Sequence, residues 1–90
     1  MSNKRTTLEI PYGQIRTAEE LGKLMRAYRK NQHLTLERVS GITNVSMRFL
    51  SEVERGKQTA ELGKVLETLY KLGLEVMIQP RGYDQGDKNK

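Results

Sequence analysis

The sequence predicts a mainly α-helical fold, a bundle of four to five helices followed by a C-terminal β-strand. Between Pro11 and Pro80, apolar residues recur at helical spacing, and candidate capping and stop residues divide this region into four segments. After Gly73 the apolar residues alternate with polar ones, which is typical of a strand. We expect an N-terminal arm with a short strand over 1–16, a helical domain over 17–73, a strand over 74–79 and a disordered tail over 80–90.

The first helix is expected to begin after Thr17, because Thr17 and Glu20 have the spacing of a capping box. Its apolar residues share one face: Leu21, Leu24, Met25 and Tyr28. The helix should end near Gln32, with His33 in the left-handed conformation that often follows a helix. Before this helix, alternating apolar residues over 6–10 predict a short strand.

Thr35 and Ser46 are expected to cap two short helices, separated by Asn44 in the left-handed conformation. The earlier helix turns Leu36 and Val39 inward, with Ile42 as a further candidate for this face. The later helix buries its own apolar stripe and ends at Gly56; that stripe consists of Phe49, Leu50 and Val53.

The fourth helix is expected to run from about Ala60 or Glu61 to Leu72, with Gly73 ending it. Its apolar stripe is assigned to the core and a dimer interface; it consists of Leu62, Val65, Leu66, Leu69 and Leu72. Gly22 and Gly63 lie inside predicted helices, and close approach between helices would explain them.

The strand after Gly73 has its apolar residues on one face: Leu74, Val76 and Ile78. A lone apolar strand needs a partner, and pairing with a second copy of the chain removes the exposed edge. We therefore assign these three residues to dimerisation. The strand over 6–10 is the alternative partner, within or between chains.

Composition excludes several classes of function. The chain has 90 residues, 16 Lys and Arg against 11 Asp and Glu, and a net charge of +5. Without cysteine it has no disulfide and no thiolate chemistry, and the single His33 leaves no basis for a catalytic, metal or cofactor site. Apolar runs are too short for a membrane span and the N-terminus does not resemble a secretory signal. We expect a small intracellular protein, and the charge is consistent with nucleic-acid binding.

The segment from Leu34 to Lys57 fits a helix-turn-helix, whose second helix enters the major groove of DNA. Ser40 is small where the helices cross, and Val45 packs under the turn. Generic three-helix packing can produce the same spacing. If the second helix is a recognition helix, its outward residues are Met47, Arg48, Ser51 and Glu52.

The run from Leu50 to Lys57, LSEVERGK, resembles the end of the recognition helix in the Xre/Cro family of helix-turn-helix repressors. The resemblance extends without a gap from Leu21 to Gly73 and implies a λ-repressor-like bundle. The family usually has Gln where this chain has Leu36, and Gly where it has Asn44. The first departure removes one expected phosphate contact.

The last helix and the strand after it are similar to the HipB antitoxin-repressors of hip toxin–antitoxin operons. This narrower resemblance implies a homodimer whose C-terminal strands pair across the dyad. It also implies a palindromic operator upstream of the chain's own genes and a HipA-type kinase toxin as a partner. A bacterial, cytoplasmic, nucleoid-associated location follows from the same resemblance.

Four residues are candidates for contacting bases. The guanidinium of Arg48 matches guanine O6 and N7, although a solvated surface arginine is the alternative. Met47 contacts a thymine methyl or covers the turn, and Ser51 bonds a base or a phosphate. Glu52 accepts a hydrogen bond from cytosine N4, or pairs at the surface with Arg48 or Arg55.

Phosphate contacts are assigned to Ser46, Arg38, Arg55 and Lys57, whose alternative roles are an ordinary cap and surface charges. The family resemblance also implies an ion pair between Arg29 and Glu54 that orients the recognition helix. The sequence thus predicts a DNA-binding repressor that acts as the antitoxin of a hip-type operon. The alternative is a protein-interaction module that binds or inhibits a kinase toxin, with DNA binding secondary.

Overall fold

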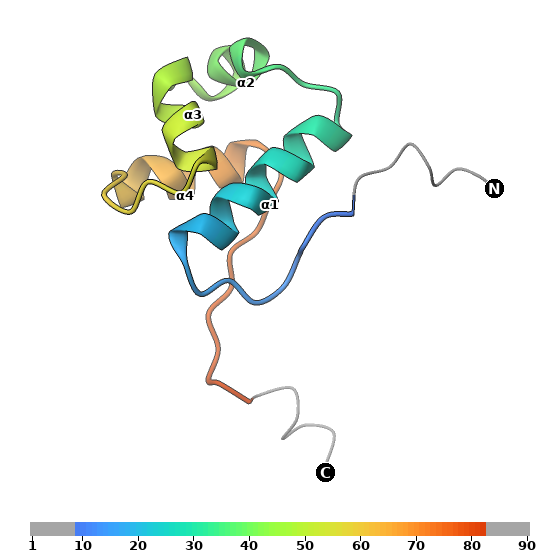
Figure 1. Cartoon of the computed structure of the whole chain (residues 1–90), viewed down its shortest axis with the longest axis vertical. Coiled ribbons are helices and arrows are strands. Elements are labelled where there is room, and N and C mark those ends of the chain that lie inside the picture. The colour runs from blue at the N-terminus through green and yellow to red at the C-terminus, as the bar shows by residue number, and fades with distance from the viewer. Residues whose placement is uncertain (1–8, 83–90) are drawn as a thin grey trace, which may run out of the picture.

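The computed structural model describes residues 9–82, which contain four α-helices joined by short loops (Figure 1). The number of helices lies within the predicted range, with no fifth helix in the described part. No helix there has the length and apolar character needed to cross a membrane. The helices are α1 (Ala18–Asn31), α2 (Leu36–Thr43), α3 (Met47–Glu54) and α4 (Leu62–Lys71).

The first three helices begin at the predicted capping residues. The Thr17 hydroxyl accepts a hydrogen bond from the Glu20 backbone N–H at 3.0 Å, and the Glu20 carboxylate accepts one from the Thr17 N–H. Thr35 caps α2 and Ser46 caps α3, each accepting from the backbone N–H three residues later at 3.0 Å. Each cap contributes about 1 kcal/mol to helix stability. Glu61 precedes α4 without a side-chain cap.

The helix ends also agree with the sequence. His33 after α1 and Asn44 after α2 are the non-glycine residues with positive φ in the described chain, at 60° and 63°. The left-handed conformation of Asn44 reverses the chain within three residues, so that α3 starts directly beside α2. Ser40 of α2 donates to the Val45 carbonyl at 2.6 Å, which fixes the turn between the two helices.

The main cluster of the core lies where α1, α3 and α4 meet. Its buried residues are Met25, Val53, Val65 and Leu69, with Leu21, Phe49, Ala60 and Leu74 packed against them. Gly22 allows α1 to approach α3 closely, because a Cβ atom there would lie 2.6 Å from the Glu54 carbonyl oxygen. The same explanation is wrong for Gly63, whose Cβ position has no other atom within 4 Å.

Three apolar side chains of the predicted helical stripes are exposed in the single chain. Ile42 is exposed because Val39 and Thr43 occupy the inner face of α2. On α4 the inner face is taken by Val65, Thr68 and Leu69, which leaves Leu62 and Leu66 in solvent.

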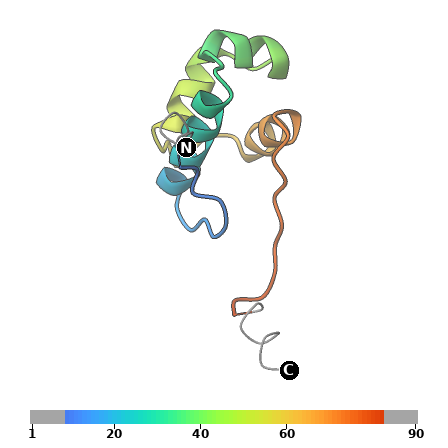
Figure 2. The same ribbon diagram turned by 90° about the vertical axis from the view of Figure 1, so that its right-hand side faces the viewer.

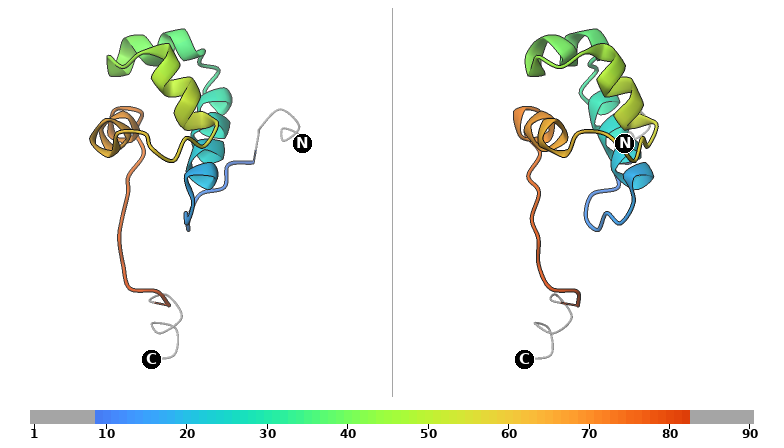
Figure 3. Two further views of the ribbon diagram at one scale, coloured as in Figure 1. Left: turned by 60° about the vertical axis from the view of Figure 1, so that its left-hand side comes forward. Right: turned by 90° about the vertical axis from the view of Figure 1, so that its left-hand side faces the viewer.

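Beyond Gly73 the chain runs away from the helices as an extended segment (Figures 2 and 3). Leu74 packs against the core, whereas Ile78 is 95% exposed. No strand forms among residues 9–82, so the predicted strand over 74–79 has no hydrogen-bonding partner within this part of the chain. Most of the strand predicted over 6–10 and of the tail predicted over 80–90 lies outside the described residues.

Candidate nucleic-acid interface

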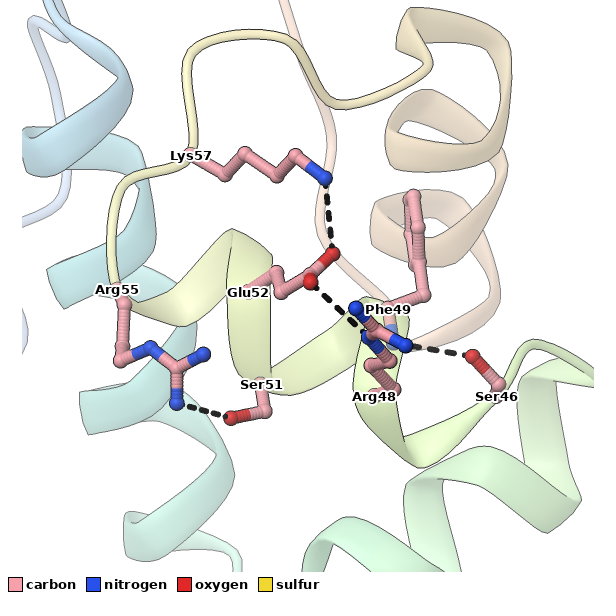
Figure 4. A network of polar contacts seen from close by, with 7 residues as sticks. All are labelled: Ser46, Arg48, Phe49, Ser51, Glu52, Arg55 and Lys57. Carbon is pink, nitrogen blue, oxygen red and sulfur yellow. Dashed lines mark hydrogen bonds and ion pairs between the residues drawn. The ribbon is translucent and has the colours of Figure 1, made fainter.

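The helix-turn-helix of α2 and α3 leaves one side of α3 facing solvent. α3 buries Leu50 and Val53, and it packs against both α1 and α2. The outward side carries a network of polar side chains that extends from the Ser46 cap to Lys57 in the following loop (Figure 4). This surface is therefore polar, cationic at its edges and anchored from behind by the core.

Arg48 is the most prominent group on this surface. Its side chain is 87% exposed, and its Nε donates to Glu52 Oε2 at 3.2 Å (Figure 4). That contact uses the inner nitrogen of the guanidinium and leaves the two terminal nitrogens directed toward solvent partners. Met47, one residue earlier, is also exposed. Both side chains lie on the first turn of α3.

The hydroxyl groups of α3 keep donor capacity toward a ligand. Ser46 accepts the capping hydrogen bond from Phe49 N–H, and Ser51 accepts one from Arg55 Nη1 at 2.9 Å. Because a hydroxyl has one donor and two acceptor positions, the O–H of each serine remains available. The hydrogen bond from Arg55 also places its guanidinium beside Ser51 (Figure 4).

Glu52 contacts two cations at once. Its Oε1 accepts from Lys57 Nζ at 3.1 Å, while Oε2 accepts from Arg48. The hydrogen bonds from Lys57 and then Arg48 lower the pKa of Glu52 below its ordinary value, so the carboxylate is ionised at neutral pH. The contact with Arg48 agrees with the surface ion pair that the sequence offered as an alternative to a base contact. The other cation bound to Glu52 is Lys57, whereas the sequence suggested Arg55.

Behind the surface, Arg29 and Glu54 form a buried bidentate ion pair. Arg29 Nε lies 2.7 Å from Glu54 Oε2, and Arg29 Nη2 lies 3.0 Å from Oε1. The side chains are only 10% and 7% exposed. The remaining terminal nitrogen of Arg29 donates to the Leu34 carbonyl at 2.8 Å. One guanidinium therefore connects α1 with the end of α3 and with the turn before α2.

Seven of the eight residues predicted to contact DNA lie on or next to α3, whereas Arg38 is exposed on α2 and makes no contact with this network in the described chain. Two contacts escaped the sequence analysis. The Tyr28 hydroxyl donates to the Leu72 carbonyl at 2.8 Å, and Lys57 bonds Glu52. Helical periodicity predicts neither contact, because the two partners of each contact do not belong to the same helix.

The arrangement suits recognition of a polyanion. A helix N-terminus with a hydroxyl cap favours negative charge, and Arg48, Arg55 and Lys57 surround the outward face of α3. An exposed guanidinium with both terminal nitrogens available has the donor geometry that matches a guanine edge.

The chain is similar in sequence to known transcriptional regulators, although no family model matches it. It is 40% identical over 68 residues to the uncharacterized HTH-type transcriptional regulator y4mF of Sinorhizobium fredii, covering 76% of this chain and 90% of that protein. It is 36% identical over 66 residues to the transcriptional regulator ClgR of Mycobacterium tuberculosis. That alignment covers 71% of this chain and 59% of ClgR.

The fold is also found in solved structures. A chain of a HipB–O4 20mer complex superimposes with a TM-score of 0.72 at 16% identity, covering 78% of this chain and 99% of the other. An MDT protein gives a TM-score of 0.71 at the same identity and the same coverage. At this low identity the likeness establishes a common helical fold.

Proposed function

Since this chain belongs to the family of helix-turn-helix transcriptional regulators, we propose that it is a repressor that binds a palindromic operator as a homodimer. The observation that carries the proposal is the exposed guanidinium of Arg48 on the outward face of α3. In this fold, α3 is the helix that enters the major groove. Its relatives are regulators and not enzymes.

Base recognition is assigned to the first two turns of α3. The terminal nitrogens of Arg48 bind guanine O6 and N7, and Met47 contacts a thymine methyl. Ser51 is short enough to let the helix backbone approach the base edges, and its O–H donates to a base or a phosphate. These side chains share the exposed surface described above.

Phosphate contacts are assigned to groups that flank the recognition helix. Ser46 lies at its N-terminus, Arg55 and Lys57 follow its C-terminus, and Arg38 extends from the first turn of α2. Each neutralised phosphate releases condensed counterions, so the affinity falls steeply as salt is added. Bound in this way, the protein represses by blocking the promoter.

Dimerisation is supported by apolar surface that the single chain leaves uncovered. Leu62, Leu66 and Tyr70 are exposed on α4, and the residues after Gly73 continue this surface. A shallow groove of about 510 Å³ lies between them, lined by Leu66, Tyr70, Gly73, Leu74, Glu75 and Val76. A second copy that pairs its 74–79 segment with this one buries the apolar surface and supplies hydrogen-bonding partners for the strand edge. Two recognition helices then face half-sites about one helical turn apart.

A more specific part of the proposal is an antitoxin role in a hip-type operon. The helical fold shared with the HipB–O4 20mer complex and the apolar segment after α4 support it. In this role the protein represses its own operon and binds a HipA-type kinase toxin in the bacterial cytoplasm. Co-purification of the chain with the kinase-like product of a neighbouring gene tests this part.

A second candidate is a protein-interaction module that inhibits a kinase toxin, with DNA binding secondary. The observation that favours it is Glu52, whose carboxylate neutralises two of the cations on the outward face of α3. Leu36, in place of the usual phosphate-binding glutamine, is a further reason.

DNA-binding measurements separate the two candidates. We expect wild-type protein to bind duplex DNA from upstream of its own gene more tightly than a random duplex, by fluorescence anisotropy. Arg48→Ala should lower this preference by about 5- to 150-fold for each half-site, the worth of one bidentate base contact, without lowering the melting temperature. Lys71→Ala, which removes a positive charge from α4, is the control and should keep it. Wild-type protein without any preference, combined with an intact toxin complex, would favour the interaction module.

Val76→Asp tests the dimer. Light scattering should give the wild type twice the 10.4 kDa chain mass and give the variant the mass of one chain. An unchanged mass for the variant would show that the 74–79 segment does not form the interface.

A further inference from the structure

The carboxylate of Glu52 lies between the two cations that border the outward face of α3. Each of its oxygens accepts one hydrogen bond, from Arg48 Nε at 3.2 Å and from Lys57 Nζ at 3.1 Å (Figure 4). We call these two contacts the Glu52 bridge. The bridge joins the first turn of the recognition helix to the loop that follows it.

The exposure of the three side chains indicates which of them meets a ligand first. Glu52 is 22% exposed and lies back against the helix, whereas Arg48 is 87% exposed and projects beyond it. A base edge that approaches α3 therefore reaches the guanidinium before the carboxylate. Each oxygen of Glu52 already accepts a hydrogen bond from a cation, and the carboxylate is less exposed than the guanidinium beside it.

The atoms used in the bridge leave Arg48 suited to guanine. Glu52 binds Nε, the nitrogen nearest the backbone, and the bond fixes the direction in which the guanidinium plane extends. Nη1 and Nη2 make no hydrogen bond in the described chain, and together they form the edge that a bidentate contact with O6 and N7 requires. Without the carboxylate, the long and exposed side chain would sample many rotamers, and ordering it on DNA would cost entropy.

The net charge of the Glu52 bridge affects the affinity of α3 for DNA phosphates. Two cations and one carboxylate give a local charge of +1 instead of +2, which weakens attraction to phosphates of any sequence. This weakening applies to the operator and to random DNA alike, so the ratio of the two affinities depends on the bidentate contact of Arg48 with guanine.

We propose that Glu52 is a positioning residue that determines specificity by orienting Arg48 toward guanine, while its charge lowers the affinity of α3 for DNA of any sequence. This inference rests on the proposed DNA-binding function. In this inference Glu52 orients the guanidinium of Arg48, whereas the sequence analysis offered a direct contact between Glu52 and a base.

The experiment compares Glu52→Gln with Glu67→Gln. Glu67 pairs with Lys71 on α4 at 3.3 Å, so both variants raise the net charge by one. Glu52→Gln removes two surface ion pairs and Glu67→Gln removes one. The probes are a duplex selected by the wild-type protein from a random-sequence library and an unselected duplex of equal length. We measure both affinities over a series of salt concentrations, with circular dichroism to verify folding.

For Glu52→Gln we expect tighter binding to the unselected duplex and a fall in the ratio of selected to unselected affinity of about three- to fivefold, the scale of an exposed ion pair. The logarithmic salt dependence on the unselected duplex should steepen by about one unit. Glu67→Gln should leave the ratio and the slope at their wild-type values. Equal behaviour of the two variants would overturn the inference.

The double variant Arg48→Ala/Glu52→Gln separates positioning from direct base contact. If Glu52 acts through Arg48, the double variant has the same affinity ratio as Arg48→Ala alone. A further fall in the ratio would show that Glu52 reads a base itself and would contradict the inference. A wild-type protein from which the library yields no preferred duplex would overturn the proposed function and this inference together.

Discussion

Gly22→Ala adds one methyl group at the point where α1 crosses the end of α3. The new Cβ would lie 2.6 Å from the Glu54 carbonyl oxygen and 2.9 Å from the Glu54 carbonyl carbon. Both are backbone atoms, which cannot rotate away as a flexible side chain can. The two helices must therefore separate, and the recognition helix moves relative to the rest of the domain.

The expected loss of stability is the difference between two opposing effects. Alanine in place of glycine stabilises a helix interior by about 1 kcal/mol. Overpacking costs about 1–3 kcal/mol, and separation of the helices also strains the buried Arg29–Glu54 pair. We expect a net destabilisation of about 1–2 kcal/mol. In a domain of this size it lowers the melting temperature by about 5–15 °C.

Gly41→Ala is the matched control for thermal unfolding followed by circular dichroism. Gly41 lies inside α2, and its Cβ position has no other atom within 4 Å. The same substitution should therefore raise stability there, by about 0.4–1 kcal/mol. If Gly22→Ala raised the melting temperature as Gly41→Ala does, the close approach of α1 and α3 would be refuted.

Three further variants test the contacts that position α3 and α4. Arg29→Met leaves the Glu54 carboxylate buried without a partner and should lower the free energy of unfolding in urea by about 3–5 kcal/mol. The double variant Arg29→Met/Glu54→Leu should recover most of this loss. An unchanged urea midpoint and an unchanged DNA affinity would contradict the role of the ion pair. Tyr28→Phe removes the donor to the Leu72 carbonyl and should cost about 1 kcal/mol in thermal unfolding, while an unchanged melting temperature would show that the bond contributes nothing. Thr17→Ala removes the cap of α1 and should cost about 1 kcal/mol by the same measurement, whereas Arg16→Ala, just before the cap, should cost little.

Consecutive residues of α1 connect the two surfaces that the proposed function requires. Arg29 binds the end of α3, and Tyr28 binds the end of α4, where the segment proposed for dimerisation begins. Because α1 is a continuous helix, these two contacts fix the direction of that segment relative to the recognition helix. In a dimer, the same contacts set the distance between the two recognition helices.

Local features of the chain were predictable because they depend on neighbouring residues. The caps at Thr17, Thr35 and Ser46, and the left-handed residues His33 and Asn44, each follow from side-chain chemistry within a few positions. The buried Arg29–Glu54 pair was expected only from the family resemblance. The two residues are far apart in sequence, so local side-chain chemistry does not indicate the contact.

Features that depend on a second element were harder to predict. An apolar stripe does not show which of its residues meet the domain's own core, so the sequence does not separate the exposed Leu62 and Leu66 from the buried residues of the same stripe. The 74–79 segment has strand periodicity, but a strand forms only where another edge is present. In the site, the i,i+4 spacing indicated the Arg48–Glu52 contact, whereas Lys57 reaches Glu52 from a loop whose path periodicity does not specify.

We propose that the outward face of α3 recognises a specific DNA sequence. The most direct measurement is the affinity of the full chain for duplex DNA from upstream of its own gene, compared with a random duplex of equal length at the same salt concentration. We predict that the first binds at least about 10³-fold more tightly, the lower limit typical of specific recognition. Equal affinities for the two duplexes across the salt series would contradict the claim.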